Sequence, residues 1–120
     1  MQVRHLLLAA FLAVVAVVAP ACAGDEPAEV VTVVGTEMAF TPHDVAVPHG
    51  DLEIRFRNDG AVIHEIAVEQ GGRAVERVYA GPGQSAVLDL DLDPGAYELT
   101  CREPGHYQGG MRGTLTVGGG

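Results

Sequence analysis

The sequence predicts an all-β fold, a Greek-key β-sandwich of about eight strands. Short runs of apolar or β-branched residues recur along the chain, and turn residues separate them. Within these runs apolar and polar side chains often alternate, so half of each sheet would face water. The sequence shows no helical periodicity of useful length. Two antiparallel sheets packed over one core would bury the apolar faces, and 120 residues allow one domain.

The individual strands follow from this pattern. They are expected at residues 30–34, 44–48, 52–57, 64–68, 73–78, 85–92, 96–101 and 113–117. The third run alternates clearly, with Leu52, Ile54 and Phe56 on one face and charged residues on the other. In the fourth run His64 points inward beside apolar side chains, whereas Glu65 points the other way.

Tyr97 stands near the start of the expected strand 96–101, directly after Gly95-Ala96. In this position it is similar to a tyrosine corner, in which the hydroxyl bonds back to upstream backbone and fixes the connection between two sheets. The alternative is that Tyr97 simply packs against its neighbours.

The connection between the last two expected strands carries three potential metal ligands, Cys101, His106 and Met111, at intervals of five residues. Pro-Gly and Gly-Gly pairs between them would let the connection fold back on itself. Because the preceding strand alternates, the Cys101 thiol should point toward the core. A loop with these residues can surround one ion.

His64 supplies a fourth ligand, since it is an inward-facing histidine at the start of a strand. Each of the four residues alone has an ordinary packing role, and only the set points to a metal. Two imidazoles, one thiolate and a weak axial thioether select copper in blue electron-transfer sites, because sulfur stabilises Cu(I) and imidazole suits both oxidation states. Zinc has no comparable use for a thioether. We therefore expect one type 1 copper ion, Cu(I)/Cu(II), bound by His64, Cys101, His106 and Met111.

These motifs resemble those of the cupredoxins, the type 1 blue copper proteins of the plastocyanin and azurin superfamily. The resemblance covers about residues 30–117. It rests on the turn Asn58-Asp59-Gly60, on the run Asp-Pro-Gly-Ala-Tyr-Glu-Leu-Thr-Cys ending at Cys101, and on the Cys-x4-His-x4-Met spacing followed by Arg-Gly-Thr. The chain departs from many cupredoxins at Glu65, where they carry an asparagine that stabilises the ligand loop. The resemblance implies a cupredoxin-like sandwich that transfers single electrons.

An electron carrier is favoured over an enzyme, because four protein ligands leave no open coordination position for a substrate. The alternative is a periplasmic or cell-surface copper-binding protein that serves copper delivery, storage or resistance. A metalloprotease is excluded, since the sequence His-Glu at 64–65 is followed by Val68 where H-E-x-x-H requires histidine.

Met38, His43 and His49 lie in early turns of the expected fold. They could form a second, exposed copper site, because thioether and imidazole are both copper ligands. The alternative is that they are solvated loop residues.

The first 21 residues predict an export signal, because a basic opening precedes an apolar run too short to span a membrane, and small residues follow it. Cys22 then stands at the cleavage point, as in the lipobox of bacterial lipoproteins. Residues 22–29 would be an acidic tether, lipidated at Cys22, and residues 30–118 the copper-binding domain. The alternatives are a lipid-anchored protein at the outer face of the membrane and a soluble periplasmic or otherwise exported one.

The net charge is −9 and the chain contains no lysine, so nucleic acid is excluded as a partner. An acidic surface favours a basic redox protein, because electrostatic steering accelerates their encounter and fades with added salt. The alternative is that the acidity merely keeps an exported protein soluble. We expect a monomer.

Overall fold

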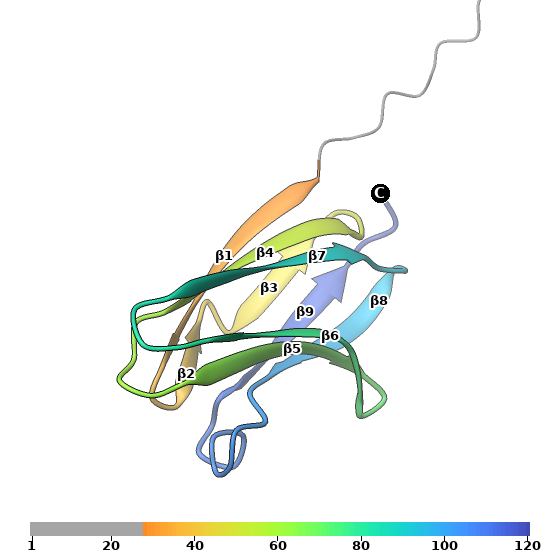
Figure 1. Ribbon diagram of the computed structural model, residues 1–120. Helices are drawn as coiled ribbons and strands as arrows, with labels where there is room; N and C mark the ends of the chain where they lie inside the picture. The colour runs from red at the N-terminus through yellow and green to blue at the C-terminus, as the bar shows by residue number, and fades with distance from the viewer. Residues whose placement is uncertain (1–27) are drawn as a thin grey trace, which may run out of the picture.

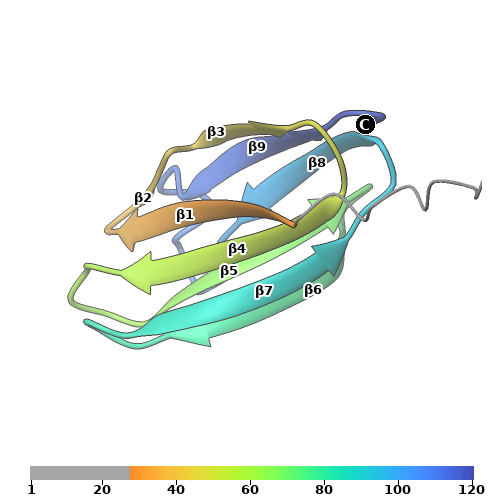
Figure 2. The same ribbon diagram turned by 90° about the horizontal axis from the view of Figure 1, so that it is seen from above.

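The computed structural model describes residues 28–120, which form nine β-strands joined by turns and loops. They are β1 (Glu29–Thr36), β2 (Ala39–Thr41), β3 (Asp44–Val47), β4 (Asp51–Asn58), β5 (His64–Gln70), β6 (Arg73–Ala80), β7 (Ser85–Asp91), β8 (Gly95–Thr100) and β9 (Arg112–Val117). One sheet has the order β2-β1-β4-β7 and the other β3-β9-β8-β5-β6, and the two form the layers of a sandwich (Figures 1 and 2). The expected all-β sandwich is confirmed. This part of the chain contains no helix able to span a membrane.

Two features of the sheets differ from the expectation. Strand β2 was not anticipated, because its three residues are too short to show a period. The sheets are also mixed and not purely antiparallel, since β1 pairs parallel with β4 and β3 pairs parallel with β9. Alternation along a strand determines which face is buried, but it carries no information about the direction of the neighbouring strand.

Strand β5 is buried on both faces, which corrects the prediction that half of each sheet faces water. Six of its seven residues are buried, and the outward-facing Glu65 and Glu69 are only 1% and 4% exposed. Thr100 and Arg102 donate hydrogen bonds to Glu69 there, and Arg77 lies 3.8 Å from Glu65, so these side chains cover the outer face. Buried carboxylates require partners. The partners of Glu69, Thr100 and Arg102, lie where β8 passes into the connection 101–111 between β8 and β9, hereafter the ligand loop.

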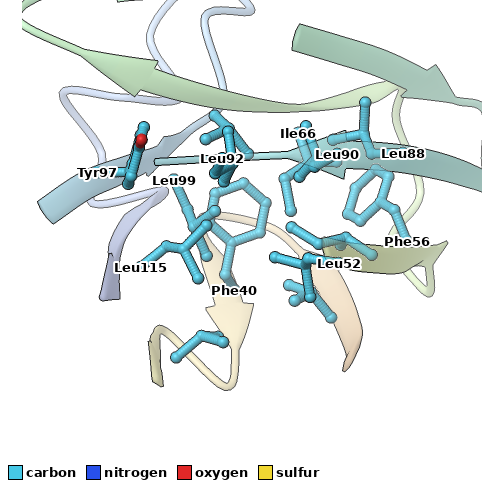
Figure 3. Close-up of a cluster of buried hydrophobic side chains, with 14 of the residues drawn as sticks. Phe40, Leu52, Phe56, Ile66, Leu88, Leu90, Leu92, Tyr97, Leu99 and Leu115 are labelled. Atoms are coloured by element: carbon cyan, nitrogen blue, oxygen red, sulfur yellow. The ribbon is translucent and has the colours of Figure 1, made fainter. Parts of the chain in front are cut away.

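The core lies between the two sheets and is built from the predicted inward positions. Leu52, Ile54 and Phe56 of β4 are at most 1% exposed. Phe40 contacts Phe56 edge to face, with ring centroids 6.2 Å apart. Burial of each such side chain contributes about 1.5–3 kcal/mol to stability. Figure 3 shows the side chains that meet there from both sheets, among them Phe40, Leu52, Phe56, Leu88, Ile66, Leu99 and Leu115.

Tyr97 forms the corner that its position suggested. Its hydroxyl donates a hydrogen bond to the carbonyl of Asp93 over 2.8 Å, and the residue is 7% exposed. The bond fixes the entry of β8 into its sheet. Because β8 leads directly to Cys101, this anchor lies on the strand that carries the thiol.

Three connections meet at one end of the sandwich, which is the lower left end in Figure 1 and lies opposite the C-terminus. They are residues 37–38 between β1 and β2, residues 59–63 between β4 and β5, and residues 101–111 between β8 and β9. A hydrogen bond of 2.9 Å from the Ala61 N–H to Glu37 joins the first two. All four predicted ligands lie at this end.

Candidate metal centre

The strands place three of the four predicted ligands at element boundaries. His64 is the first residue of β5, Cys101 directly follows β8, and Met111 directly precedes β9, while His106 lies in the loop between them. Strands β5 and β8 are antiparallel neighbours, so the start of one lies beside the end of the other. That pairing brings His64 next to a loop that is distant from it in sequence.

Three of the four donors converge on one point. One donor atom each from His64, Cys101 and His106 lies within 4.8 Å of the others. The two Nδ1 atoms are 3.2 Å apart, and the Cys101 Sγ lies 3.4 Å from the His106 Nδ1. His64 and Cys101 are fully buried, whereas His106 is 9% exposed. Among residues 28–120 this is the one group of three histidine, cysteine or acidic side chains with such spacing.

Met111 is fully buried and closes the ligand loop through its backbone. Its N–H donates to the His106 carbonyl over 3.0 Å, and its carbonyl accepts from the Cys101 N–H over 3.1 Å. A Cβ added at Gly35 would lie 3.1 Å from the Met111 methyl group and 2.9 Å from the Phe56 ring. The Met111 side chain therefore lies against β1 and the core, and its backbone joins it to His106 and Cys101.

The ligand loop is a series of hydrogen-bonded turns. The His106 N–H donates to the Glu103 carbonyl over 2.9 Å, and the Gly109 N–H donates to the Gly105 carbonyl over 2.9 Å. Gly105 and Gly110 have φ values of +82° and +110°, which side chains disfavour. The predicted return of the chain thus depends on these two glycines.

The Cys101 thiol is held by the backbone of the neighbouring strand. The Glu65 N–H donates to Sγ over 3.3 Å. Burial raises the pKa of the Cys101 thiol, and hydrogen bonds from the N–H groups of Glu65 and Glu103 offset part of this rise. A thiolate at this position therefore needs a cation beside it.

Comparison with known proteins assigns the family. The chain matches the family described as Cupredoxin-like domain over residues 6–117. It belongs to the cupredoxin-like family. A search of curated proteins finds no significant match.

Solved auracyanin structures share the cupredoxin fold. Dithionite-reduced auracyanin from Roseiflexus castenholzii is 24% identical with a TM-score of 0.68, covering 77% of this chain and 98% of the other. Auracyanin A, described as a "blue" copper protein from Chloroflexus aurantiacus, is 23% identical with a TM-score of 0.66, covering 76% and 99%. Auracyanin B is 24% identical with a TM-score of 0.63, covering 78% and 91%. At these identities the likeness is one of fold.

In this cupredoxin Asn58 stabilises the loop that leads to His64. Its side-chain N–H groups donate to the carbonyls of Val62 and Ala80 over 2.8 and 2.7 Å, and its Oδ1 accepts from the Gly60 N–H over 2.8 Å. Glu65, at the position where many cupredoxins have asparagine, contributes its backbone N–H to the thiol. Its carboxylate instead lies on the outer face of the sheet, with Oε2 3.8 Å from Arg77. A buried asparagine before an Asp-Gly turn was the available sequence signal for this role.

Glu37 contacts a predicted ligand and was missed by the sequence analysis. Its Oε1 lies 3.0 Å from the His64 Nε2 and accepts hydrogen bonds from the N–H groups of Ala61 and Val62 over 2.9 and 3.3 Å. These bonds, that of Ala61 above all, hold the pKa of Glu37 below its usual value. No signal in the sequence links a turn residue to a histidine so far along the chain.

A stack of side chains follows the loop ligands. Arg102, Tyr107 and Arg112 come directly after Cys101, His106 and Met111. The guanidinium carbons of Arg102 and Arg112 lie 4.0 and 5.1 Å from the centroid of the Tyr107 ring. Each predicted ligand on the loop is thus followed directly by one residue of this stack. The cation–π contacts of the two arginines with Tyr107 stabilise the stack.

Glu69 anchors this stack to the sheet. Arg102 donates two hydrogen bonds to its carboxylate, over 2.9 and 2.6 Å, and the Thr100 hydroxyl donates a third over 2.9 Å. The Tyr107 hydroxyl donates to Glu98 over 2.7 Å. The Arg102 guanidinium beside Glu69 holds the pKa of that carboxyl below its usual value. The ligand loop is therefore held on the outer face of the five-stranded sheet.

The structure does not bring Met38, His43 and His49 together. His43 and His49 lie beyond opposite ends of β3, and four strand residues alone span about 13 Å. His43 lies 3.1 Å from Asp44, and His49 lies 3.7 Å from Glu29. Met38 instead contacts the ligand loop, since a Cβ at Gly109 would lie 3.2 Å from its sulfur. A joint copper site of these three residues is not formed.

Glu69→Gln should destabilise the metal-free protein by roughly 1–3 kcal/mol at pH 7, because the charged hydrogen bonds from Arg102 are weakened. A lowered pKa in the folded state stabilises the fold above the unfolded pKa and stops doing so as the pH falls through the folded value. The difference between the variant and the native chain should therefore shrink below about pH 4. Urea unfolding at several pH values measures it.

Glu53→Gln is the matched control, since Glu53 pairs with the more exposed Arg55 on the other sheet. It should change stability little at either pH. Equal unfolding curves for Glu69→Gln and the native chain would contradict the anchoring role.

Proposed function

We propose that this chain is an exported type 1 blue copper protein that carries single electrons between redox proteins. One observation supports this above all: the Cys101 thiol and the His64 and His106 imidazoles converge within 4.8 Å in a buried position. Met111 lies at the end of the same loop and would be the axial ligand.

The donor set fits copper. It combines a thiol, two imidazole nitrogens and a thioether, and no carboxylate belongs to the group of three that converges. Soft sulfur with imidazole suits both copper oxidation states, whereas carboxylate and water ligands suit harder ions. Bound copper would supply the one-electron couple Cu(II)/Cu(I).

The residues of the chain hold the donors in a fixed geometry. His64 is held by the β5 ladder, and Cys101 by the Glu65 N–H over 3.3 Å. His106 and Met111 are held by a mutual backbone hydrogen bond of 3.0 Å. Fixed donors reduce the rearrangement that accompanies a change of charge, which is the property that an electron carrier needs.

His106 would provide the route for electrons. It is 9% exposed, whereas His64, Cys101 and Met111 are fully buried. Exposed apolar residues of the neighbouring connection, Val62 and Ile63, are 43% and 47% exposed. A partner that docks at this end would approach the copper ligands most closely through the His106 ring.

A carrier is favoured over an enzyme and over a copper donor. Four protein donors leave no open position for a substrate, so we propose no catalytic role. A protein that delivers copper must release it readily, and full burial of three donors favours retention instead. The rate at which the protein loses copper therefore distinguishes a copper-delivery protein from an electron carrier.

Export and partner choice rest on the sequence. Residues 1–21 and Cys22 lie outside the described residues 28–120. We propose that the signal is removed and that Cys22 anchors the protein by a lipid at the outer face of the membrane. The mass of the mature protein tests this. An added acyl mass would support the anchor, whereas a mature protein that begins after Cys22 would contradict it. The net charge of −9 favours a basic redox partner.

Cys101→Ser tests the ligand assignment. The native protein should bind one Cu(II) with intense visible absorption from charge transfer between thiolate and copper. The serine variant should lose this absorption, because the oxygen is a harder donor. Spectra recorded during a Cu(II) titration measure it. Retained colour in the variant, or uptake of zinc alone by the native protein, would show the assignment to be wrong.

Met111 is tested by two substitutions that differ in the donor they supply. Met111→Leu should keep copper and raise the reduction potential, because no axial donor remains to stabilise Cu(II). Met111→Gln should lower the potential, because the amide oxygen is a harder axial donor. Voltammetry on both variants measures the shifts, and unchanged potentials in both would mean that Met111 only packs.

A further inference from the structure

The carboxylate of Glu37 joins the surface to a buried ligand. One oxygen, Oε1, lies 3.0 Å from the Nε2 atom of His64 and also accepts from the Ala61 and Val62 N–H groups over 2.9 and 3.3 Å. The His64 side chain has no exposed surface, whereas the Glu37 side chain is 42% exposed. The same oxygen therefore fixes the ligand ring and the connection that leads into it.

This contact determines which nitrogen of His64 carries the proton. A neutral imidazole has one N–H group, and an ionised carboxylate can only accept a hydrogen bond. The proton must therefore lie on Nε2, which leaves the lone pair of Nδ1 free. That Nδ1 lies 3.2 Å from the His106 Nδ1, on the side where the donors converge. A metal ligand is commonly oriented in this way by a group behind it.

We propose that Glu37 is a positioning residue for the copper site, which holds His64 with its Nδ1 lone pair toward the metal and places a negative charge behind this ligand. The proposal rests on the proposed copper function. The charge favours the more positive oxidation state, Cu(II), because opposite charges attract. Partial exposure to water weakens this effect, and we expect a shift of about tenfold in the ratio of Cu(I) to Cu(II).

Gly60 provides the space for the contact. A Cβ added there would lie 2.3 Å from the Glu37 Oε1 and 2.7 Å from the His64 Nε2. Gly60 is not among the glycines with positive φ, so alanine can adopt its backbone conformation. Gly60→Ala would therefore press on both the carboxylate and the buried His64 ring, so the contact depends on a residue without a side chain at this position.

The first experiment reads the tautomer in the metal-free protein by ¹⁵N NMR of the His64 ring. The native protein and Glu37→Gln should both show the proton on Nε2, because the amide oxygen of glutamine also accepts. Glu37→Ala should lose this preference. An unchanged tautomer in Glu37→Ala would overturn the proposal. This readout needs no copper, so it decides the role of Glu37 even if the proposed function fails.

The second experiment measures the ratio of Cu(I) to Cu(II) at a fixed ambient potential. Glu37→Gln keeps the hydrogen bond but removes the charge, and should shift the ratio about tenfold toward Cu(I). Glu76→Gln is the matched control, since Glu76 is exposed on β6 and pairs with Val68, away from the ligands. It should leave the ratio unchanged. Equal ratios for Glu37→Gln and the native protein would overturn the electrostatic part of the proposal.

Discussion

Strands β5 and β8 pair antiparallel from Ala67 opposite Thr100 to Glu69 opposite Glu98, and the candidate site depends on this pairing. It places the start of β5 beside the end of β8, so that the Glu65 N–H reaches the Cys101 Sγ over 3.3 Å. His64 then faces the loop that carries His106. If this register slipped by one residue, His64 and Cys101 would no longer lie on the same face of the sheet.

The same pairing explains why charged side chains are buried outside the core. Residues of β5 have neighbours on both sides, so Glu69 lies beneath Thr100 and Arg102 and not in water. Burial of this carboxylate costs free energy unless its hydrogen bonds are made, and Arg102 makes two of them. Arg102 also stacks on Tyr107, the residue after His106. The ligand loop is thus fixed from the outer face of the sheet as well as from the core.

Much of this arrangement could be predicted from the sequence, and the remainder depends on tertiary contacts. Cys101, His106 and Met111 recur on one connection, so local spacing identifies them, and His64 is identified by its inward position on a strand. The contact of Glu37 with His64 could not be inferred, because Glu37 lies in the connection between β1 and β2 whereas His64 begins β5, 27 residues later. The parallel pairing of β1 with β4 was missed for a related reason, since alternation does not reveal strand direction.

The central claim is that the site exchanges electrons while retaining its metal. Stopped-flow mixing of the copper-loaded protein with a small basic haem protein, together with a competing Cu(I) chelator, tests this most directly. We predict rapid electron exchange that slows as added salt shortens the Debye length from about 10 Å at 0.1 M to about 3 Å at 1 M. Copper should remain bound over many cycles. Slow exchange that does not depend on salt, together with ready loss of Cu(I) to the chelator, would contradict the account.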